Sequence, residues 1–531
     1  MSNIWEQCLA DNGGNNTEVI QCMFEKSKDY TDASVQNVAA GVDTFYLIFA
    51  GALVYFMQTG FAMLCAGSIR AKNCKNVLLW NLLDSCGGAL AFWSVGYAFA
   101  YGGDTEGGPT TFIGNAYFFL IGLEDLHMWF FQFAFACALS SIVAGTVAER
   151  CKMQAYLLYS GFLCGFVYPV AAHAFWAYQG FLSPGNANPL FGVGAVDLAG
   201  SGPVHMTGGV LALVMAVILG PRMGRFYDEN GAPYDEPRDI PGHSVALQFL
   251  GTFCLWFGWY GFNPGSTLTI ASSNRGSVAA LAAVNTSLGA AAGAVSAMFT
   301  ASILEERRTG VVTYDLTNAM NGCLTGLVAV TAPCASVEPW AGFAIGVCAG
   351  WVYLTGSWLL VKYKIDDAVD AIPVHMGGGM WGVLATGLFS SEPRLNEAYG
   401  ITEHIGWFYE WGRGSANFNL MGAQIVAVLF VIAWVVGIMG PYIWILNYFN
   451  MLRVDPLEEK VGMDISRHKG PAYVADDDNK EHVMELEQRR SSRQLDVSRS
   501  RSGRFSKKSA KQEPVEEPHQ DEPVMQNEES A

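Results

Sequence analysis

Two histidines lie in nearly identical surroundings, far apart in the chain. A Pro-Val dipeptide directly precedes both His205 and His375, and two or more glycines follow each within four residues. An aspartate, Asp197 or Asp367, lies eight residues before each histidine. Each copy opens a long apolar segment, where a titratable side chain is costly to keep. Two such side chains in matching contexts therefore indicate a shared functional site.

The chemistry open to two histidines includes metal binding, a proton relay and the hydrogen-bonded lining of a pore. Metal sites usually gather several ligands at short spacing, but these two are 170 residues apart, with no His-x-x-x-His or Cys-x-x-Cys nearby. We therefore expect no metal. One histidine alone would ordinarily just satisfy a backbone group, whereas the repetition favours a paired lining. Neutral imidazoles can share a hydrogen bond and present their edges to a small polar solute.

The two aspartates precede the starts of broken helices. There a carboxylate can accept backbone N–H bonds and complement the positive helix end. This role is sufficient for Asp367, which we expect at the inner surface. Asp197, expected on the outer side, would also lower the cost of holding a nearby cation. For Asp197 we favour capping and long-range electrostatics over direct ligation.

Membrane-spanning helices are the elements that position these residues. Of 531 residues, 51% are hydrophobic and only 15% are charged, too few charges for a soluble surface. Crossing a bilayer takes roughly 20 apolar residues. Eleven such runs predict an all-α polytopic membrane protein, at 44–66, 77–101, 128–148, 154–177, 203–220, 244–263, 277–303, 311–332, 340–361, 373–390 and 420–447.

The order of these spans predicts an internal symmetry. With the N-terminus outside, the inner loops hold twelve lysines and arginines and the outer loops three, which favours N-out, C-in. The histidine copies open the fifth and tenth spans, and five spans reverse the direction through the membrane. We therefore expect inverted five-helix repeats with a site between them, and an eleventh helix as an outer brace.

The corresponding division of the chain has six parts. They are an extracellular segment at 1–42, the repeats at 43–220 and 221–390, an outer loop with the eleventh helix at 391–450, a regulatory cytosolic segment at 451–475 and a disordered tail at 476–531. Cys8 and Cys22 could pair in an oxidising exterior, within or between subunits. Serines among basic residues in the tail are candidates for phosphorylation, or the basic run could touch anionic lipid.

Three aromatic residues and one hydroxyl are expected near the outer ends of the spans: Phe135, Trp176, Phe262 and Ser266. A single aromatic residue at an interface usually belongs to an anchoring belt. If these four converge outside the histidines, they form a small aromatic cup that suits a small cation, because ring faces attract cations. Pro264 and its neighbouring glycines should break the helix and leave Ser266 at a mouth.

Several motifs together resemble the ammonium transporters, specifically the plant and algal type with a regulatory cytosolic tail. The resemblance covers 40–475 and rests on Asp197 to Gly209, Ala148-Glu149-Arg150, Gly258 to Ser266, Val284-Asn285-Thr286, and His375 with its glycines. It implies a homotrimer with one narrow pore per subunit, which we expect in the plasma membrane. The roles it implies are substrate binding by Trp176, Ser266, Phe135 and Asp197, a stacked gate of Phe135 and Phe262, and a twin-histidine pore lining of His205 and His375.

The segment after the last span resembles the family's regulatory switch. Gly462 and the surroundings of Ser466 are placed as in plant-type members. The phosphorylated residue there is usually threonine, so Ser466 keeps the hydroxyl but leaves the kinase open.

These observations predict an ammonium transporter rather than an enzyme. An apolar pore cannot cheaply admit a bare cation, so we expect NH4+ recruitment at the cup, deprotonation near the gate, passage of NH3 and return of the proton by a separate polar route, with net charge movement. The alternatives are an ammonium sensor signalling through its tail and an electroneutral NH3 channel of the Rhesus type, against which Trp176 and Ser266 argue. No nucleophile, metal cluster or phosphate loop accompanies the histidines. We expect no cofactor and no nucleic-acid partner.

Overall fold

The computed structural model describes residues 2–12, 15–103 and 110–473. The predicted disordered tail at 476–531, with its serine-rich basic run, lies outside the described residues.

The described chain is built of helices. Its β-structure is limited to three isolated bridges, with no strand among the described residues. The α-helices are α1 (Ser2–Asp11), α2 (Asn16–Ser68), α3 (Cys74–Ala91), α4 (Tyr97–Tyr101), α5 (Leu126–Val147), α6 (Met153–Phe162), α7 (Tyr168–Trp176), α8 (Thr207–Leu219), α9 (Val245–Gly265), α10 (Ser273–Thr309), α11 (Leu316–Thr331), α12 (Pro339–Lys362), α13 (Gly378–Phe389), α14 (Glu392–Tyr399), α15 (Trp407–Gly412), α16 (Asn419–Tyr448), α17 (Pro456–Val461) and α18 (Met463–Arg467).

Every one of the eleven predicted apolar runs falls on a helical stretch. Eight helices in the described ranges are long and apolar enough to cross a membrane. The runs at 77–101, 311–332 and 373–390 lie outside that set; the helix of the second, α11, has only 16 residues. The prediction of a helical multi-pass protein is confirmed. The count of eleven spans and the N-out, C-in orientation stay predictions.

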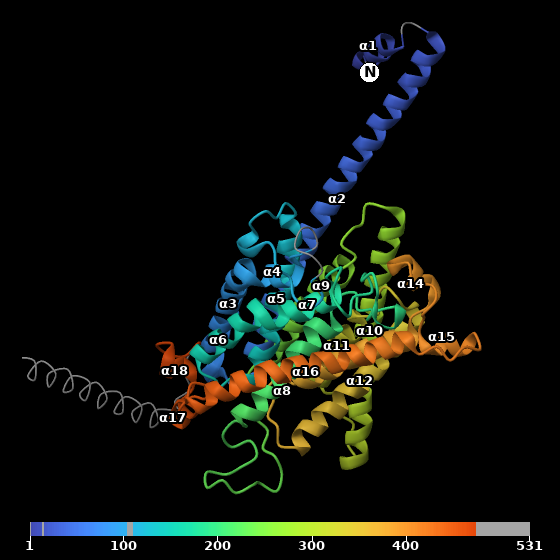
Figure 1. Ribbon diagram of the computed structural model, residues 1–531. Helices are drawn as coiled ribbons and strands as arrows, with labels where there is room; N and C mark the ends of the chain where they lie inside the picture. Colours follow the sequence, from blue (N-terminus) through green and yellow to red (C-terminus); the bar gives the residue numbers. More distant parts are fainter. Residues whose placement is uncertain (1, 13–14, 104–109, 474–531) are drawn as a thin grey trace, which may run out of the picture. The chain divides into compact units, whose positions relative to one another are not determined.

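The N-terminal segment is helical and continuous with the first apolar run. Helix α2 begins at Asn16 and ends at Ser68, and its N-terminal half projects away from the helical bundle with α1 beside its far end (Figure 1). A disulfide joins Cys8 on α1 to Cys22 on α2 within the one chain. The pairing that the sequence left open is therefore formed within the chain, and it closes the hairpin of these two helices.

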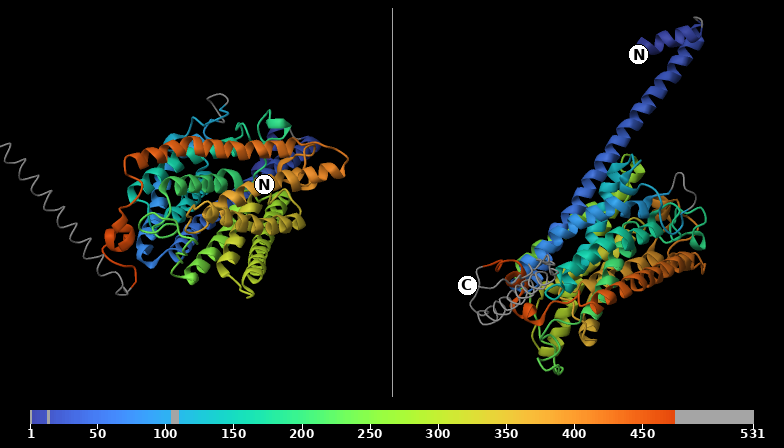
Figure 2. Two further views of the ribbon diagram at one scale, coloured as in Figure 1. Left: turned by 90° about the horizontal axis from the view of Figure 1, so that it is seen from below. Right: turned by 60° about the vertical axis from the view of Figure 1, so that its left-hand side comes forward.

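Helices approach closely where small residues meet. This is expected in lipid, because an apolar side chain gains no hydrophobic free energy by leaving lipid for another helix, so close packing holds the helices together. A Cβ atom added to Gly293 on α10 would lie 2.3 Å from the carbonyl oxygen of Gly322 on α11. Helix α16 packs against α8 and α13 and runs along the outside of the bundle (Figures 1 and 2). Its position agrees with the outer brace expected for the eleventh apolar run.

The two histidine segments share one local structure. Each begins as a π-helical turn, η6 (Ser201–Met206) or η7 (Ile372–Gly377), and continues as α8 or α13. The glycines after each histidine lie where the segments cross. A Cβ on Gly209 would lie 2.1 Å from the Met376 nitrogen, and one on Gly379 would lie 2.5 Å from the Ser201 carbonyl oxygen. These glycines therefore let the histidine-bearing turns approach each other.

The helix end expected around Pro264 lies one residue beyond the proline. Helix α9 continues through Pro264 to Gly265, and Ser266 forms its C-cap. Proline lies one residue before the helix end, so its missing N–H removes a hydrogen bond only from the final turn, where the loss is tolerated. Ser266 still lies at the helix terminus, as expected.

Candidate functional site

The two histidines meet side by side in the interior. Nδ1 of His205 lies 3.2 Å from Nδ1 of His375, and the ring centroids are 5.3 Å apart with planes inclined by 16°. One Nδ1 must donate and the other accept in such a contact, so the geometry fits a pair that shares a single proton there. A doubly protonated pair would place two N–H groups against each other.

Two aromatic rings hold His205 in place. Trp259 stacks on it with centroids 5.1 Å apart, and Phe262 lies at 5.3 Å. Trp259 is fixed in turn because its indole N–H donates to the Thr331 hydroxyl at 2.9 Å. Nε2 of His205 has no hydrogen-bond partner in the described part of the chain. That nitrogen can therefore bond a solute or a water molecule.

The predicted gate residues are in direct contact. The rings of Phe135 on α5 and Phe262 on α9 lie 4.2 Å apart between centroids, and Trp176 meets Phe135 edge-on at 6.1 Å. Phe262 therefore touches Phe135 on one side and His205 on the other. The structure brings the aromatic residues and the histidine pair into one continuous series.

A cavity of about 680 Å³ lies over this series, and Phe135, Trp176, Asp197 and Ser266 line it. The Ser266 hydroxyl donates to the Phe262 carbonyl at 2.7 Å. Its proton is therefore occupied, and its lone pairs are left as acceptors. We call this space the outer cavity.

Asp197 acts as the cap expected from its position. One carboxylate oxygen accepts from the backbone N–H groups of Gly200 and Ser201 at 2.6 and 3.1 Å, and the other from Gly202 at 2.7 Å. The Trp176 indole N–H donates to the Asp197 carbonyl at 2.8 Å. The carboxylate thus fixes the start of η6, while its backbone orients the Trp176 ring.

Asp367 plays the matching part for η7. Its carboxylate accepts from the Ile372 N–H at 2.7 Å and from the Thr146 hydroxyl at 2.9 Å. It lines a different cavity, of about 400 Å³, together with Arg222, Arg225 and Asp370. We call this space the inner cavity. The two aspartates thus share a capping role but border two different spaces.

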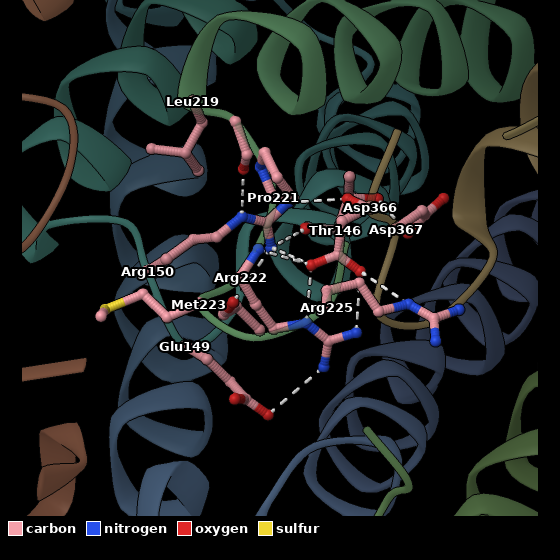
Figure 3. A network of polar contacts seen from close by, with 12 residues as sticks. Thr146, Glu149, Arg150, Leu219, Pro221, Arg222, Met223, Arg225, Asp366 and Asp367 are labelled. Carbon is pink, nitrogen blue, oxygen red and sulfur yellow. Dashed lines mark hydrogen bonds and ion pairs between the residues drawn. The ribbon is translucent and has the colours of Figure 1, made fainter. Parts of the chain in front are cut away.

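A buried ionic network closes one wall of the inner cavity (Figure 3). Arg222 forms a bidentate pair with Asp366 at 2.8 and 2.9 Å and also reaches Glu149 at 3.6 Å. Arg150 donates to backbone carbonyls on both sides, those of Gly220 and Asp366. Although burial alone would raise it, the hydrogen bonds and charge of Arg222 hold the pKa of the Asp366 carboxyl well below its ordinary value.

The predicted regulatory residues lie where the chain after α16 packs on the start of α3. The Asp464 carboxylate accepts from the N–H groups of Lys75 and Asn76, both at 3.0 Å. Gly462 has a φ of 100°, and a Cβ there would lie 2.6 Å from the Lys72 side chain. Ser466 is 1% exposed in this docked segment. Docking therefore needs glycine at 462 and covers Ser466.

One buried acid was not singled out from the sequence. Asp84 lies inside the apolar run at 77–101, is fully buried on α3, and contacts serine hydroxyls from α5 and α6. A carboxylate in the middle of an apolar run was the available signal. Trp259 was quoted only as part of a motif, because nothing in its sequence position shows that it stacks on His205.

Comparison with known proteins gives consistent matches over most of the chain. A family model described as the Ammonium Transporter Family matches residues 44–473. Ammonium transporter 1 member 3 of Solanum lycopersicum is 42% identical over 456 residues, which cover 83% of this chain and 94% of that protein. Ammonium transporter Amt2 of Archaeoglobus fulgidus is 41% identical over 449 residues, covering 82% and 89%.

Solved structures agree with this match. A protein named Sensor Amt Protein superimposes with a TM-score of 0.68 at 30% identity, covering 81% of this chain and 99% of that one. Saccharomyces cerevisiae Mep2 gives a TM-score of 0.65 at 26% identity, covering 78% and 87%.

Proposed function

The chain belongs to the ammonium transporter family, and from this premise we propose that it recruits NH4+ in the outer cavity, deprotonates it near the Phe135 and Phe262 rings, and conducts NH3 past His205 and His375. One observation carries the proposal. Trp176, Phe135, Phe262 and His205 form an unbroken series of ring contacts with centroid distances of 6.1, 4.2 and 5.3 Å.

The outer cavity has the chemistry for a small cation. The faces of Phe135 and Trp176 attract positive charge through their quadrupoles. The Ser266 oxygen can accept an N–H bond from NH4+ because its own proton is held by the Phe262 carbonyl. Asp197 adds a negative charge nearby while its oxygens stay bonded to backbone N–H groups, so its part is electrostatic and structural.

The histidine pair favours a neutral solute. Even paired charges in a low dielectric carry a desolvation penalty of several kcal/mol, and the pore residues next to the histidines are Phe262 and Trp259. NH3 can pass and exchange hydrogen bonds with the imidazole edges, such as Nε2 of His205. The proton follows a separate polar route, and the cycle moves net charge.

We also propose that each subunit of a homotrimer in the plasma membrane holds one such pore, and that docking of α17 and α18 regulates it. A kinase can reach Ser466 only after α18 leaves α3, because the residue is buried when docked. Phosphorylation would then oppose return to the docked state. A phosphate carries about −1.5 to −2 charge, and docking would have to bury it, because Ser466 is 1% exposed in the docked segment.

The test of this function is ammonium uptake together with ammonium-induced current in a cell that lacks its own ammonium transporters. The intact chain should show both, and Trp176→Ala should need a higher ammonium concentration for half-maximal uptake. Current proportional to uptake supports net charge movement. Uptake with no current in membranes of defined composition would reject that step and favour an electroneutral channel.

A sensor function is the second candidate, since one structural relative is named as a sensor. A His205→Ala variant that abolishes uptake but keeps ammonium signalling would favour it. Loss of both together supports transport as the primary function.

A further inference from the structure

A carboxylate is enclosed by hydroxyl groups in the middle of the helical bundle, away from the residues assigned so far. Asp84 on α3 is 0% exposed. Ser140 and Ser141 on α5 donate to one of its oxygens at 2.7 and 3.0 Å, and Ser160 on α6 donates to the other. We call Ser140, Ser141 and Ser160 the hydroxyl cluster.

This carboxylate has no fixed counter-ion. Among the described residues, no ion pair within 4.0 Å involves Asp84. An acid inside a membrane span is expensive to maintain and is by default a functional group. Its negative charge must therefore be balanced by a proton or by another mobile cation.

The distances between the hydroxyl cluster and the Asp84 carboxylate fit a proton as the balancing cation. Ser140 and Ser141 are hydrogen-bonded directly to the carboxylate, and Ser141 also lies 2.6 Å from Oε1 of Gln58. A metal ion placed among these oxygens would have to replace the direct hydrogen bonds. A proton can be added within these hydrogen bonds without separating the serine hydroxyls from the carboxylate.

Two of the serines have a second acceptor, which lets the site satisfy both states of the acid. When Asp84 is ionised, the cluster donates to it. When Asp84 is protonated, Ser141 can turn its proton to Gln58 Oε1 at 2.6 Å, and Ser140 can turn to the Cys137 carbonyl at 3.0 Å. Their oxygens are then free to accept from the new carboxylic acid.

A small cavity borders both Ser141 of the cluster and His375 of the histidine pair. The cavity has a volume of about 20 Å³, and its polar lining includes Ser141, Asn321 and His375. One water needs on the order of 10–15 Å³ and two to four polar partners. The cavity therefore has room for one water between a pore histidine and the serine that contacts Asp84.

We propose that Asp84 is a proton-accepting side branch of the pore, reached from His375 through one water and Ser141. The proposal rests on the proposed deprotonation of NH4+: the released proton passes first to the histidine pair, which contacts Phe262, and from there leaves the path of NH3. An N–H bond of the protonated histidine pair breaks and an O–H bond forms on the water. The water passes a proton to Ser141, and the Ser141 proton passes to Asp84 Oδ2. The result is a neutral histidine pair and a neutral carboxylic acid, with no other reactant.

The remaining titratable groups near Asp84 are Tyr156 and Tyr159 on α6, Cys137 on α5 and Cys164 on η4 (Leu163–Val167). None is a base that would compete for the proton. Asp84 is therefore the proton acceptor in this part of the bundle.

Infrared difference spectroscopy tests the proposal directly. The full-length protein in lipid vesicles is switched from sodium to ammonium, and the C=O stretching region of carboxylic acids is recorded. We expect an ammonium-induced carboxylic acid band that is lost in Asp84→Asn. The band should also be lost in Ser141→Ala, which keeps the acid but interrupts the path.

Ser160→Ala is the matched control, because it removes one hydroxyl from Asp84 without touching the path. Its band should persist, shifted by the lost hydrogen bond. Absence of the band in the unsubstituted protein, or its persistence in Asp84→Asn, would overturn the proposal. So would an unchanged band in a well-folded Ser141→Ala protein, since Asp84 would then be protonated by another path or serve only in packing.

The same variants separate this proposal from the transport mechanism. If the unsubstituted protein takes up ammonium without current but shows the Asp84 band, net charge movement fails and the side branch stands. If current accompanies uptake and no band depends on Asp84, the side branch fails and the transport mechanism stands.

Discussion

The proposed pore depends on which atoms of its two imidazoles are engaged. The Nδ1 contact of 3.2 Å occupies one nitrogen of each ring, and the stack of Trp259 on His205 fixes the ring plane. What remains to face a solute is the opposite edge of each ring. The pair therefore presents directed hydrogen-bonding atoms within an otherwise apolar wall.

His205→Ala should lower ammonium uptake by about 5- to 140-fold. The substitution leaves Nδ1 of His375 without its partner, and an unsatisfied buried group costs about 1–3 kcal/mol, where 1.4 kcal/mol corresponds to a factor of ten. Labelled uptake at matched surface expression measures the effect. His404→Ala is the control, because that histidine bonds Asn417 away from the pore and should keep uptake. Equal uptake by His205→Ala and the unsubstituted chain would remove the pair from the transport path.

Ser266→Ala should weaken ammonium recruitment with little change in maximal rate. A hydrogen bond to a charged group contributes about 1.5–3 kcal/mol, so half-maximal uptake should need about 10- to 100-fold more ammonium. Ser266→Thr retains the hydroxyl and should stay close to the unsubstituted chain. A reduced maximal rate at unchanged half-saturation would instead place Ser266 outside the recruitment step.

Sequence position was enough to predict the aspartate caps but not all of the pore. A carboxylate ahead of a helix start has backbone N–H groups within reach, so Asp197 and Asp367 could be interpreted locally. Trp259 and Asp84 act through neighbours on other helices. Only the packing of those helices shows that Trp259 stacks on His205 and that Asp84 meets the hydroxyl cluster.

At the scale of elements, the two histidines are positioned by a crossing of η6 and α8 with η7 and α13. The glycines that follow each histidine allow that crossing, since backbone rather than side chain lies opposite them. This gives the repeated glycines a physical reason. The same local structure in both copies also supports the inverted repeats, which stay a prediction.

Gly209→Ala should lower the stability of the folded protein and not only the rate of transport. Its Cβ would lie 2.1 Å from the Met376 backbone nitrogen, and backbone cannot rotate away as a flexible side chain can. Overpacking of this kind costs about 1–3 kcal/mol, which should appear as a lower thermal unfolding temperature of the solubilised protein. Gly437→Ala on α16 is the control, because no atom lies within 4 Å of its added Cβ. Equal stability of the two variants would contradict the crossing geometry.

Asp464→Ala should loosen the docked segment after α16. The carboxylate caps the N–H groups of Lys75 and Asn76, and losing a cap costs about 0.5–2 kcal/mol. Hydrogen exchange of the Ser466 amide should therefore speed up by about 2- to 30-fold. Arg467→Ala removes only the half-exposed ion pair with Glu458 and should change the exchange little. Unchanged exchange in Asp464→Ala would mean that other contacts hold the segment.

Hydropathy predicted where the helices lie but not where a π-helical turn replaces α-helix. All eleven apolar runs are helical, since length and composition were sufficient to identify them. The π-helical turns η6 and η7 were expected only as broken helix starts, because a π turn depends on the tertiary fit of its side chains. The polar part of α2 carries no membrane signal, so its continuity with the first apolar run was not predicted.

At the scale of the whole molecule, apolar side chains remain exposed on the outer helices. Four large apolar residues on α12 are each at least half exposed: Trp340, Phe343, Trp351 and Trp358. Lipid or a neighbouring copy must cover such a face. This agrees with a multi-pass membrane protein and with the predicted homotrimer.

We propose that this protein conducts ammonium past its paired histidines without a different partner protein. The most direct test uses purified protein in liposomes of defined lipid, with ammonium jumps and sodium jumps of equal size and simultaneous recording of uptake and current. The account predicts uptake and current for ammonium, neither for sodium, and loss of both in a His205→Ala, His375→Ala double variant that remains folded. Undiminished ammonium uptake by that folded double variant would contradict the account.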